Sequence, residues 1–426
     1  MTRMKESGID WIGQIPEEWE VIKIKFFTYM KGRIGWQGLK ADEFIDEGPY
    51  LVTGTDFKNG RVNWDTAYHI SQNRYEQAPE IQLQIGDLLV TKDGTVGKLA
   101  LIDELPDSAS LNSHLLVLRP LFNRYDNHFL YYVLSSLEFK NYFQKVSIGS
   151  TMDSLSQEKM GEFIFALPNI NEQNSISRYL DKKTAQLDKV KTLLEEQIQK
   201  LKDYRASLIY ETVTKGLDKN VPMKDSGIDW IGQVPQGWEI TKHKYIMTKV
   251  KEICTHYEGQ DILSLTRQGV VVRDIESGKG KMPASFDGYQ FLEKGDLLFC
   301  LFDIDVTPRC VGVVENNGLT SSAYSRFKLN DKTSVYYYYY LFLSMDEDKV
   351  LLHLSKNLRH SLTEDDFGGI ETVVPSYGEQ LRIADYLSKV TKSIDEIVQL
   401  KQKQIENINK QRQTLIYDYV TGKRRV

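Results

Sequence analysis

The chain has 426 residues, of which 54 are Lys or Arg and 59 are Asp or Glu, so its net charge is −5. No apolar run approaches the ~20 residues that a membrane helix requires, and the N-terminus has no apolar region typical of a signal peptide. The three cysteines show no CxxC spacing, which argues against a disulfide framework or a zinc ribbon and for a reducing, cytoplasmic location.

The sequence contains an internal repeat. Residues 4–20 read MKESGIDWIGQIPEEWE and residues 223–239 read MKDSGIDWIGQVPQGWE, with 13 of 17 positions identical. A second pair follows, PNINEQ from Pro168 and PSYGEQ from Pro375. Because repeats fix the architecture of a chain, we expect two copies of one unit, each a globular segment followed by a long helix.

The first globular segment mixes short β-rich runs with Gly, Asp and Asn turns. The run GDLLVTKDGTVGKLALID, residues 86–103, predicts two strands joined by a polar loop, and a helix is expected near residues 127–144. Backbone amides, hydroxyls and two lysines of this loop suit a phosphate; the alternative is a hairpin turn with solvated lysines. The candidate DNA contacts in this segment are Arg33, Trp36, Lys92, Thr95, Lys98, Ser150 and Thr151.

Two long helices are predicted by heptad patterns. The segment 172–215 contains no Pro or Gly, and Leu recurs every seven residues from Leu180 to Leu208. The second copy keeps this register from Leu387 to Leu415, with Lys401 interrupting it. A heptad of this length requires a partner helix, and antiparallel pairing of the two within one chain is the simplest arrangement. Capping-box spacing marks both starts, at Asn169 with Glu172 and at Ser376 with Glu379.

The repeat also predicts how the chain closes. The second SGIDWIG segment should pack near the end of the first helix, since only residues 217–222 separate them. By the same logic, residues 4–20 should pack near residues 417–421, which places the two termini close together. The expected organisation is globular segments at 1–168 and 217–375, with the helices at 169–216 and 376–426.

The second globular segment repeats the strand but not the loop. GDLLFC from Gly295 matches the first GDLL, and a helix is expected near residues 334–355. Arg can pair with guanine and Gln with adenine in the major groove, so the candidate DNA contacts here are Arg267, Gln268, Arg273, Asn357, Arg359, His360 and Ser361. The alternative for each is a solvated surface residue.

The charge balance does not favour nucleic-acid binding. Residues 20–165 contain 15 basic and 19 acidic side chains, and residues 240–372 contain 16 and 19. Any DNA contact must therefore come from a segregated basic face. Catalytic signatures are missing as well, because there is no P-loop, GxGxxG, HExxH or GxSxG motif, and the seven histidines are scattered. The sequence predicts a protein that reads a ligand, with no catalytic and no metal-binding residues.

These residues resemble the specificity subunit of type I restriction–modification systems over essentially the whole chain. SGIDWIG…IPEEW and SGIDWIG…VPQGW are similar to segments that open its globular domains, and GDLLVTKDGTVGK resembles a target-recognition strand and loop. ILSLTRQGVVVRD is similar to a second recognition-domain subtype. LPNINEQNSISRYLD and VPSYGEQLRIADYLS resemble the starts of its two central helices.

The resemblance implies an α+β fold with two mixed α/β target-recognition domains separated by a pair of long antiparallel coiled-coil helices. It implies a non-catalytic subunit that reads a bipartite, asymmetric site in double-stranded DNA, one half per domain, with the helices setting the gap. It also implies two methyltransferase subunits as partners and, through them, restriction subunits. S-adenosylmethionine, ATP and Mg²⁺ would be bound by those partners and not by this chain.

Two other classes of function remain open from sequence. A two-headed coiled-coil scaffold would bind proteins with no DNA requirement, and the net negative charge suits it. A nuclease or methyltransferase whose motif has diverged would show activity as the purified chain alone, with metal or methyl donor.

Overall fold

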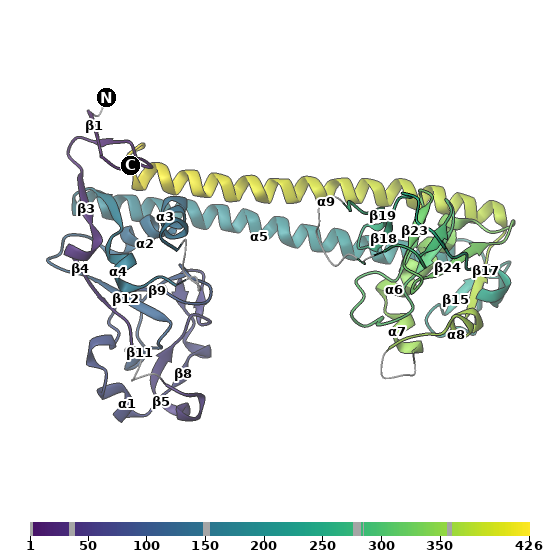
Figure 1. The fold of residues 1–426 in the computed structure, drawn as a ribbon, viewed down its shortest axis with the longest axis horizontal. Coiled ribbons are helices and arrows are strands. Elements are labelled where there is room, and N and C mark those ends of the chain that lie inside the picture. Colours follow the sequence, from purple (N-terminus) through teal and green to yellow (C-terminus); the bar gives the residue numbers. More distant parts are fainter. Residues whose placement is uncertain (1–2, 34–38, 148–153, 276–282, 284, 356–359) are drawn as a thin grey trace. The chain divides into compact units, whose positions relative to one another are not determined.

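The computed structural model describes residues 3–33, 39–147, 154–275, 283, 285–355 and 360–426. The chain divides into two compact units. Unit 1 comprises residues 1–194 and 403–426, and unit 2 comprises residues 195–402. Two long helices, α5 (Ile170–Lys215) and α9 (Tyr377–Val420), are labelled in Figure 1. By the bounds of the units, each helix has one part in unit 1 and the other part in unit 2. Both helices predicted from the heptads are therefore present.

A six-stranded sheet organises unit 1. Its strand order is β4-β12-β9-β10-β7-β6. The bounds are β4 (Thr28–Lys31), β12 (Leu115–Pro120), β9 (Leu88–Thr91), β10 (Leu99–Leu101), β7 (Arg61–Val62) and β6 (Phe57–Lys58). The predicted GDLL strand is β9, and all four of its residues are buried. Leu88 and Val90 face one hydrophobic cluster and Leu89 another, so this strand is covered on both faces and needs a continuous apolar run.

Smaller elements cover the two faces of this sheet. One face packs against a three-stranded sheet of β11 (Ala109–Leu111), β5 (Ile45–Val52) and β8 (Tyr68–His69), through a cluster that includes Val52, Leu89 and Leu111. The other face packs against helices and short strand pairs. These are α2 (Asn127–Ser135), α3 (Leu137–Ser147), α4 (Gln157–Gly161), β3 (Glu20–Lys23) with β13 (Ile164–Leu167), and β1 (Met4–Glu6) with β2 (Gln14–Pro16). Helix α1 (Gln72–Glu76) contacts β5.

Unit 2 is built on a four-stranded sheet in the order β17-β24-β21-β22. The bounds are β17 (Met247–Val250), β24 (Ser325–Leu329), β21 (Leu297–Phe299) and β22 (Val311–Val313). Strand pairs flank it: β14 (Met223–Asp225) with β15 (Gln233–Pro235), β16 (Glu239–Lys242) with β25 (Glu371–Val374), β18 (Leu263–Thr266) with β19 (Gly269–Val272), and β20 (Gln290–Leu292) with β23 (Gly318–Thr320). Its short helices are α6 (Val335–Glu347), α7 (Val350–Leu354) and α8 (Glu364–Gly369).

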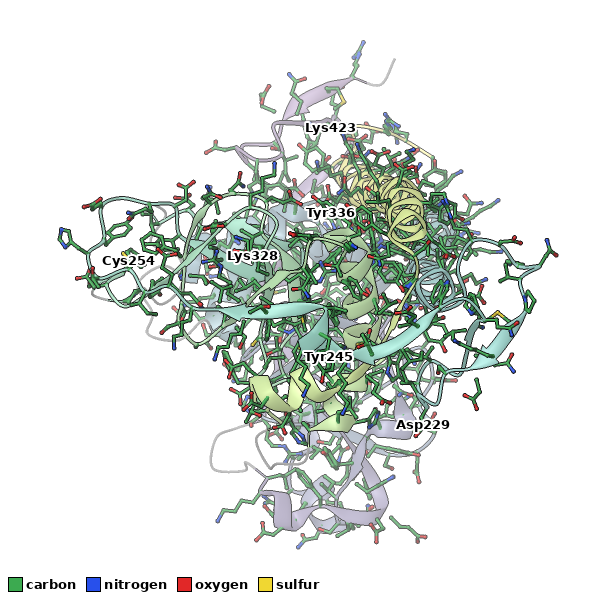
Figure 2. All side chains as sticks on the ribbon, turned by 90° about the vertical axis from the view of Figure 1, so that its right-hand side faces the viewer. Asp229, Tyr245, Cys254, Lys328, Tyr336 and Lys423 are labelled. Carbon is green, nitrogen blue, oxygen red and sulfur yellow. The ribbon has the colours of Figure 1, made fainter. Side chains whose placement is uncertain are left out.

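A small lobe extends from one side of unit 2. Cys254, Ile262 and Leu319 form its core, and Figure 2 shows Cys254 on one side of the unit and Asp229, from the second SGIDWIG segment, on the other. Cys254, Cys300 and Cys310 are buried free thiols. Among the described residues, no helix is long and apolar enough to cross a membrane.

The helices α5 and α9 run antiparallel within each unit. In unit 1, the rings of Tyr179 and Tyr419 lie 4.6 Å apart and Asp188 pairs with Arg412 at 3.5 Å. In unit 2, Gln197 accepts a hydrogen bond from Lys401 at 2.6 Å, and Arg205 pairs with Asp395 at 3.3 Å. Lys401, which interrupts the heptad, therefore bridges the two helices through its ammonium group.

The start of each helix is tied to the repeated segment before it. Glu172 donates its backbone N–H to the Asn169 side chain at 3.0 Å, as the capping box predicted. The Glu172 carboxylate, however, accepts the indole N–H of Trp19 at 3.1 Å. In unit 2, Glu379 accepts the indole N–H of Trp238 at the same distance. The repeated Trp and Glu are thus partners in space.

The repeated Gln that follows each Glu is also explained by its contacts. Gln173 and Gln380 are buried. Gln173 accepts the N–H of Asp126 at 2.9 Å and donates to the carbonyl of Pro168 at 2.8 Å. Gln380 makes the matching pair of bonds, to Ser334 at 2.8 Å and Pro375 at 2.9 Å. One side chain therefore joins helix, proline turn and globular segment in both units.

The N-terminal segment packs on the end of α9, as the repeat predicted. The Tyr417 hydroxyl donates to the carbonyl of Trp11 at 3.2 Å. Gly422 adopts a φ of +71°, and a Cβ there would collide with Pro16, so only glycine allows this close approach. In unit 2, the Tyr210 hydroxyl donates to the carbonyl of Trp230 at 3.0 Å. The prediction that both SGIDWIG segments lie on helix ends, with the termini close in unit 1, is confirmed.

Candidate nucleic-acid interface

The predicted polar loop of unit 1 is the turn between β9 and β10. The Thr91 hydroxyl donates to the carbonyl of Thr95 at 2.6 Å and accepts the N–H of Lys98 at 2.9 Å. Gly94 and Gly97 adopt φ values of +71° and +83° with open space around them. The loop is a tight hairpin turn held by one buried hydroxyl, and it leaves Thr95 and Lys98 exposed.

The charge on Lys92 is offset by its neighbours. Lys92 and His114 approach the Asp93 carboxylate at 3.0 and 3.5 Å. Partial burial raises the pKa of Asp93, but hydrogen bonds from Lys92, Ser154 and His114 outweigh it, so the pKa lies below its usual value. The carboxylate therefore stays ionised. Of the two lysines in this loop, Lys98 is the more exposed.

Other polar loops converge on the same end of the sheet. A Cβ on Gly54 would lie 2.8 Å from the Thr91 side chain, which places the loop 53–56 beside the turn. Thr53 and Thr55 share a hydroxyl hydrogen bond of 2.6 Å in that loop. Leu155 donates its N–H to the carbonyl of Lys92 at 2.8 Å. Sequence reasoning did not select Thr53, Thr55 or His114, since folding alone brings them to Lys92. Trp36, Ser150 and Thr151 lie outside the described residues.

Arg33 is placed differently from the prediction. Only 5% of its surface is exposed, and its guanidinium donates to the carbonyl of Leu111 at 3.0 Å and the hydroxyl of Ser110 at 2.8 Å. Burial lowers the pKa of Arg33 to about 10, which keeps it charged at neutral pH. Arg33 therefore joins β4 to β11 inside unit 1 and offers little surface to DNA.

In unit 2 a longer loop of residues 301–309 occupies the corresponding position. Leu362 donates to the carbonyl of Leu301 at 2.8 Å, as Leu155 does to Lys92 in unit 1. His360 accepts the N–H of Ile304 through its carbonyl at 3.1 Å, and Ser361 accepts that of Asp303 at 3.4 Å. The predicted His360 and Ser361 thus support this loop. Asn357 and Arg359 lie outside the described residues.

The predicted Arg267 and Gln268 form the exposed tip of the β18–β19 hairpin. The Thr266 hydroxyl holds the turn, since it accepts the N–H of Gln268 at 3.1 Å and donates to the carbonyl of Gly269 at 3.0 Å. A two-stranded ribbon fits the major groove, where apolar side chains contact thymine methyl groups. Val271 and Val272 are 37% and 45% exposed on this ribbon; sequence reasoning missed them because a strand rich in Val looks like core.

Arg273 follows β19 and is half-buried. Its backbone N–H donates to the carbonyl of Ile262 at 2.7 Å, so the residue is fixed at the base of the ribbon, away from the tip. In this structure Lys92, Thr95 and Lys98 lie together in unit 1, and Arg267 and Gln268 in unit 2. His360 and Ser361 are next to the 301–309 loop.

An ion pair between an arginine and a buried aspartate anchors the central strand below the loops in each unit. Arg119 forks onto Asp87 in unit 1 with two bonds of 2.7 Å. In unit 2, Arg326 donates to Asp296 at 2.6 Å, and both side chains are 1% exposed. The two Asp residues are the D of the repeated GDLL. The arginines come from strand positions two residues apart, so the pair is kept although its sequence register is not.

Metal binding was not expected from sequence. Among the described residues, no group of three or more His, Cys, Asp or Glu side chains is placed to hold a metal ion. The candidate interface therefore consists of polar groups on two exposed elements, the β9–β10 turn in unit 1 and the β18–β19 ribbon in unit 2.

Comparisons with known proteins agree on one family. The type I restriction modification DNA specificity domain matches residues 16–202. A putative type I restriction enzyme MjaX specificity subunit from Methanocaldococcus jannaschii is 24% identical over 97% of this chain and 96% of its own length. The EcoKI specificity subunit of Escherichia coli K12 is 22% identical over 46% of this chain and 43% of its own length.

Two solved structures share the fold. A chain from a study of complex assembly and conformational transition of the type I R-M system has a TM-score of 0.71, with 13% identity, 95% of this chain and 98% of its own covered. The HsdS subunit from Thermoanaerobacter tengcongensis has a TM-score of 0.53, with 12% identity, 98% of this chain and 99% of its own covered.

Proposed function

We propose, from the premise that this chain belongs to the specificity subunits of type I restriction–modification systems, that each unit reads one half of a bipartite, asymmetric DNA site. One observation carries the proposal: the scaffold of the two units is the same, and the polar loops on it are different. The Trp–Glu bond, the buried Gln and the Asp–Arg pair occur in both units.

The differences between the units lie where a ligand would be read. Unit 1 presents the Thr91–Lys98 turn, and unit 2 presents the 301–309 loop and the β18–β19 ribbon. Base identity is read by side chains in the groove, whereas phosphate contacts are the same for every sequence. Two related but non-identical surfaces therefore suit two different half-sites.

The helices support a defined gap between the half-sites. Each of α5 and α9 has one end in unit 1 and the other in unit 2, and the two helices run antiparallel within each unit. We therefore propose that they form one coiled-coil pair separating two target-recognition domains. Two readers on one face of B-DNA must lie about one helical turn apart, ~34 Å, or a multiple of it. The length of the helix pair would set that spacing.

In this proposal, DNA methylation and cleavage are carried out by partner subunits. Two methyltransferase subunits would bind this chain and would use S-adenosylmethionine; restriction subunits attached through them would use ATP and Mg²⁺. Exposed apolar residues on the helices suit such docking: Val190 and Leu193 in unit 1, and Ile397 and Leu400 in unit 2. These four stand at matching positions of the repeat, as two copies of one partner would require.

Methylation sequencing tests the proposal. A host carrying the chain with its neighbouring methyltransferase should methylate adenine in a bipartite motif. Arg267→Ala with Gln268→Ala should then relax or change one half only, because this pair lies in unit 2. Thr95→Ala with Lys98→Ala, which removes a phosphate contact, should lower methylation without changing the motif. A wild-type strain without a bipartite motif, or a variant pair that alters both halves, would contradict the proposal.

A further inference from the structure

Each unit carries an exposed aromatic ring beneath a lysine, at the same position of the repeat. The rings are Phe26, at the end of the 3₁₀ turn η1 (Ile24–Phe26), and Tyr245, at the end of η6 (His243–Tyr245). Both are 63% exposed, and Figure 2 labels Tyr245 on unit 2. The ammonium of Lys25 lies 5.4 Å from the centre of the Phe26 ring, and that of Lys244 lies 5.2 Å from the Tyr245 ring.

The two turns are supported in the same way. A Cβ on Gly161 of α4 would lie 3.3 Å from Cβ of Lys25, and a Cβ on Gly368 of α8 would lie 3.4 Å from Cβ of Lys244. Each lysine stem therefore packs over a helix glycine. The backbone of the following residue, Phe27 in unit 1, accepts an N–H from the end of β12 at 2.8 Å, and unit 2 repeats this bond at 3.0 Å.

In these two turns the buried position differs between the units, whereas the exposed positions are retained. Selection for stability alone would favour the opposite pattern. The buried residue that opens the turn is Ile24 in unit 1 and His243 in unit 2. The exposed lysine is unchanged, and the exposed ring stays aromatic. Surface positions are ordinarily freer to vary than buried ones, and a retained exposed residue indicates binding. The constraint on these two turns therefore comes from outside the fold.

The turns lie away from the loops that would read DNA. In unit 1, β4 leads from η1 to Gly32, whose Cβ would lie 3.9 Å from the Lys92 side chain. Four strand residues span about 13 Å. In unit 2, β17 leads away from η6 in the same manner. In unit 1 the Lys–aromatic turn and the reading turn thus lie beyond opposite ends of one strand.

We propose that the two Lys–aromatic turns are equivalent docking sites for two copies of one protein partner, the methyltransferase subunit, and this inference rests on the function proposed above. The DNA half-sites differ, and so do the reading loops; the partner is the same for both units, and so is the turn. The partner surface would offer an apolar pocket for the ring and a carboxylate for the lysine, since exposed aromatic residues serve as interface anchors.

The acidic residues around the two lysines stand at different positions in the two units. In unit 1, Glu162 already accepts Lys25 at 2.5 Å and Lys23 at 2.7 Å. In unit 2, Gly369 stands at the matching position and supplies no carboxylate. Glu364 and Asp365 instead line the same hollow as Lys244, so carboxylates flank the lysine in both units and binding of the partner at either turn should weaken with salt.

Native mass spectrometry and titration with the purified methyltransferase subunit test the inference on the full chain. Phe26→Ala and Tyr245→Ala should each weaken one of the two binding steps by about 10-fold or more, the loss typical of an aromatic anchor, and the double variant should weaken both. Phe26→Tyr and Tyr245→Phe should bind as the wild type does, because each introduces the residue of the other unit. Tyr68→Ala, an exposed tyrosine on β8, is the matched control and should change neither step.

The possible outcomes separate the inference from the function beneath it. A double variant that binds two copies with wild-type affinity overturns the docking sites and leaves the proposed function standing. A wild-type chain that binds no methyltransferase overturns both. Thermal unfolding of each variant as the free chain verifies that a lost binding step does not come from a lost fold.

Discussion

His243 should make unit 2 sensitive to acid, in a way that unit 1 is not. Its imidazole is fully buried between Phe342 and Phe367, with ring centres 5.0 and 4.8 Å away, and it hydrogen-bonds to the carbonyl of Phe367 at 2.9 Å. Burial lowers the pKa of His243 from its usual 6.5 to about 3, although the carbonyl opposes this. Ile24 occupies the same position in unit 1.

The pH dependence follows from the direction of this shift. The unfolded chain binds a proton at His243 below pH 6.5, whereas the folded unit does not until about pH 3. Stability is therefore fully present above pH 6.5 and falls as the pH drops through this window. Each pH unit costs about 1.4 kcal/mol, so pH 4.5 should cost unit 2 about 3 kcal/mol through this one group.

His243→Ile should remove that loss, because it places the residue of unit 1 at the same site in unit 2. Hydrogen exchange followed by mass spectrometry resolves the two units, and rates corrected for intrinsic pH effects give their opening free energies. Wild-type unit 2 should lose about 3 kcal/mol more than the variant between pH 7 and pH 4.5. An equal loss in both proteins would refute the argument; unit 1 serves as the internal control.

Three further results are expected. Arg326→Met should destabilise unit 2 by about 3–5 kcal/mol, since it leaves the Asp296 carboxylate buried without its partner, and Arg119→Met should cost unit 1 less because that arginine is 27% exposed; denaturant unfolding that ranks them in reverse would contradict this. Gly422→Ala should free the N-terminal segment, at a cost of about 1–3 kcal/mol from backbone strain, seen as faster proteolysis of residues 3–20; an unchanged rate would argue against the closure. Lys98→Ala should reduce the salt dependence of DNA binding by about one phosphate contact, and an unchanged slope would remove Lys98 from the interface.

Sequence reasoning succeeded where a long or repeated pattern determines structure. The heptads predicted α5 and α9, and the repeat predicted that the SGIDWIG segments lie on helix ends. The heptad recurs many times along each helix, and the SGIDWIG segment occurs twice in the chain. The GDLL run predicted a strand because a short apolar run, here Leu88 to Val90, is typical of a strand buried in the middle of a covered sheet.

The candidate site was harder to predict, because it depends on which loops meet. Arg33 follows a glycine and looks like a surface residue, yet contacts with Ser110 and Leu111, nearly eighty positions later, bury it. The carbonyl of His114 accepts the N–H of Lys92 at 2.8 Å, and its imidazole reaches the Asp93 carboxylate, although the residues are more than twenty positions apart in the sequence. The capping-box spacing likewise did not reveal that the Glu172 carboxylate would accept the indole N–H of Trp19. Contacts of high sequence separation leave no local pattern.

The most direct test of the two-reader account is to replace residues 240–372 with the matching segment of a relative that has a different target, and to sequence methylated DNA from the host. Two scaffold contacts, that of Trp238 with Glu379 and that of Gln380 with Pro375, lie outside this segment and are therefore retained. The account predicts that one half of the bipartite motif changes while the other half and the gap stay as they were. If both halves change together, or the motif does not change, the two units do not read independently and the account is wrong.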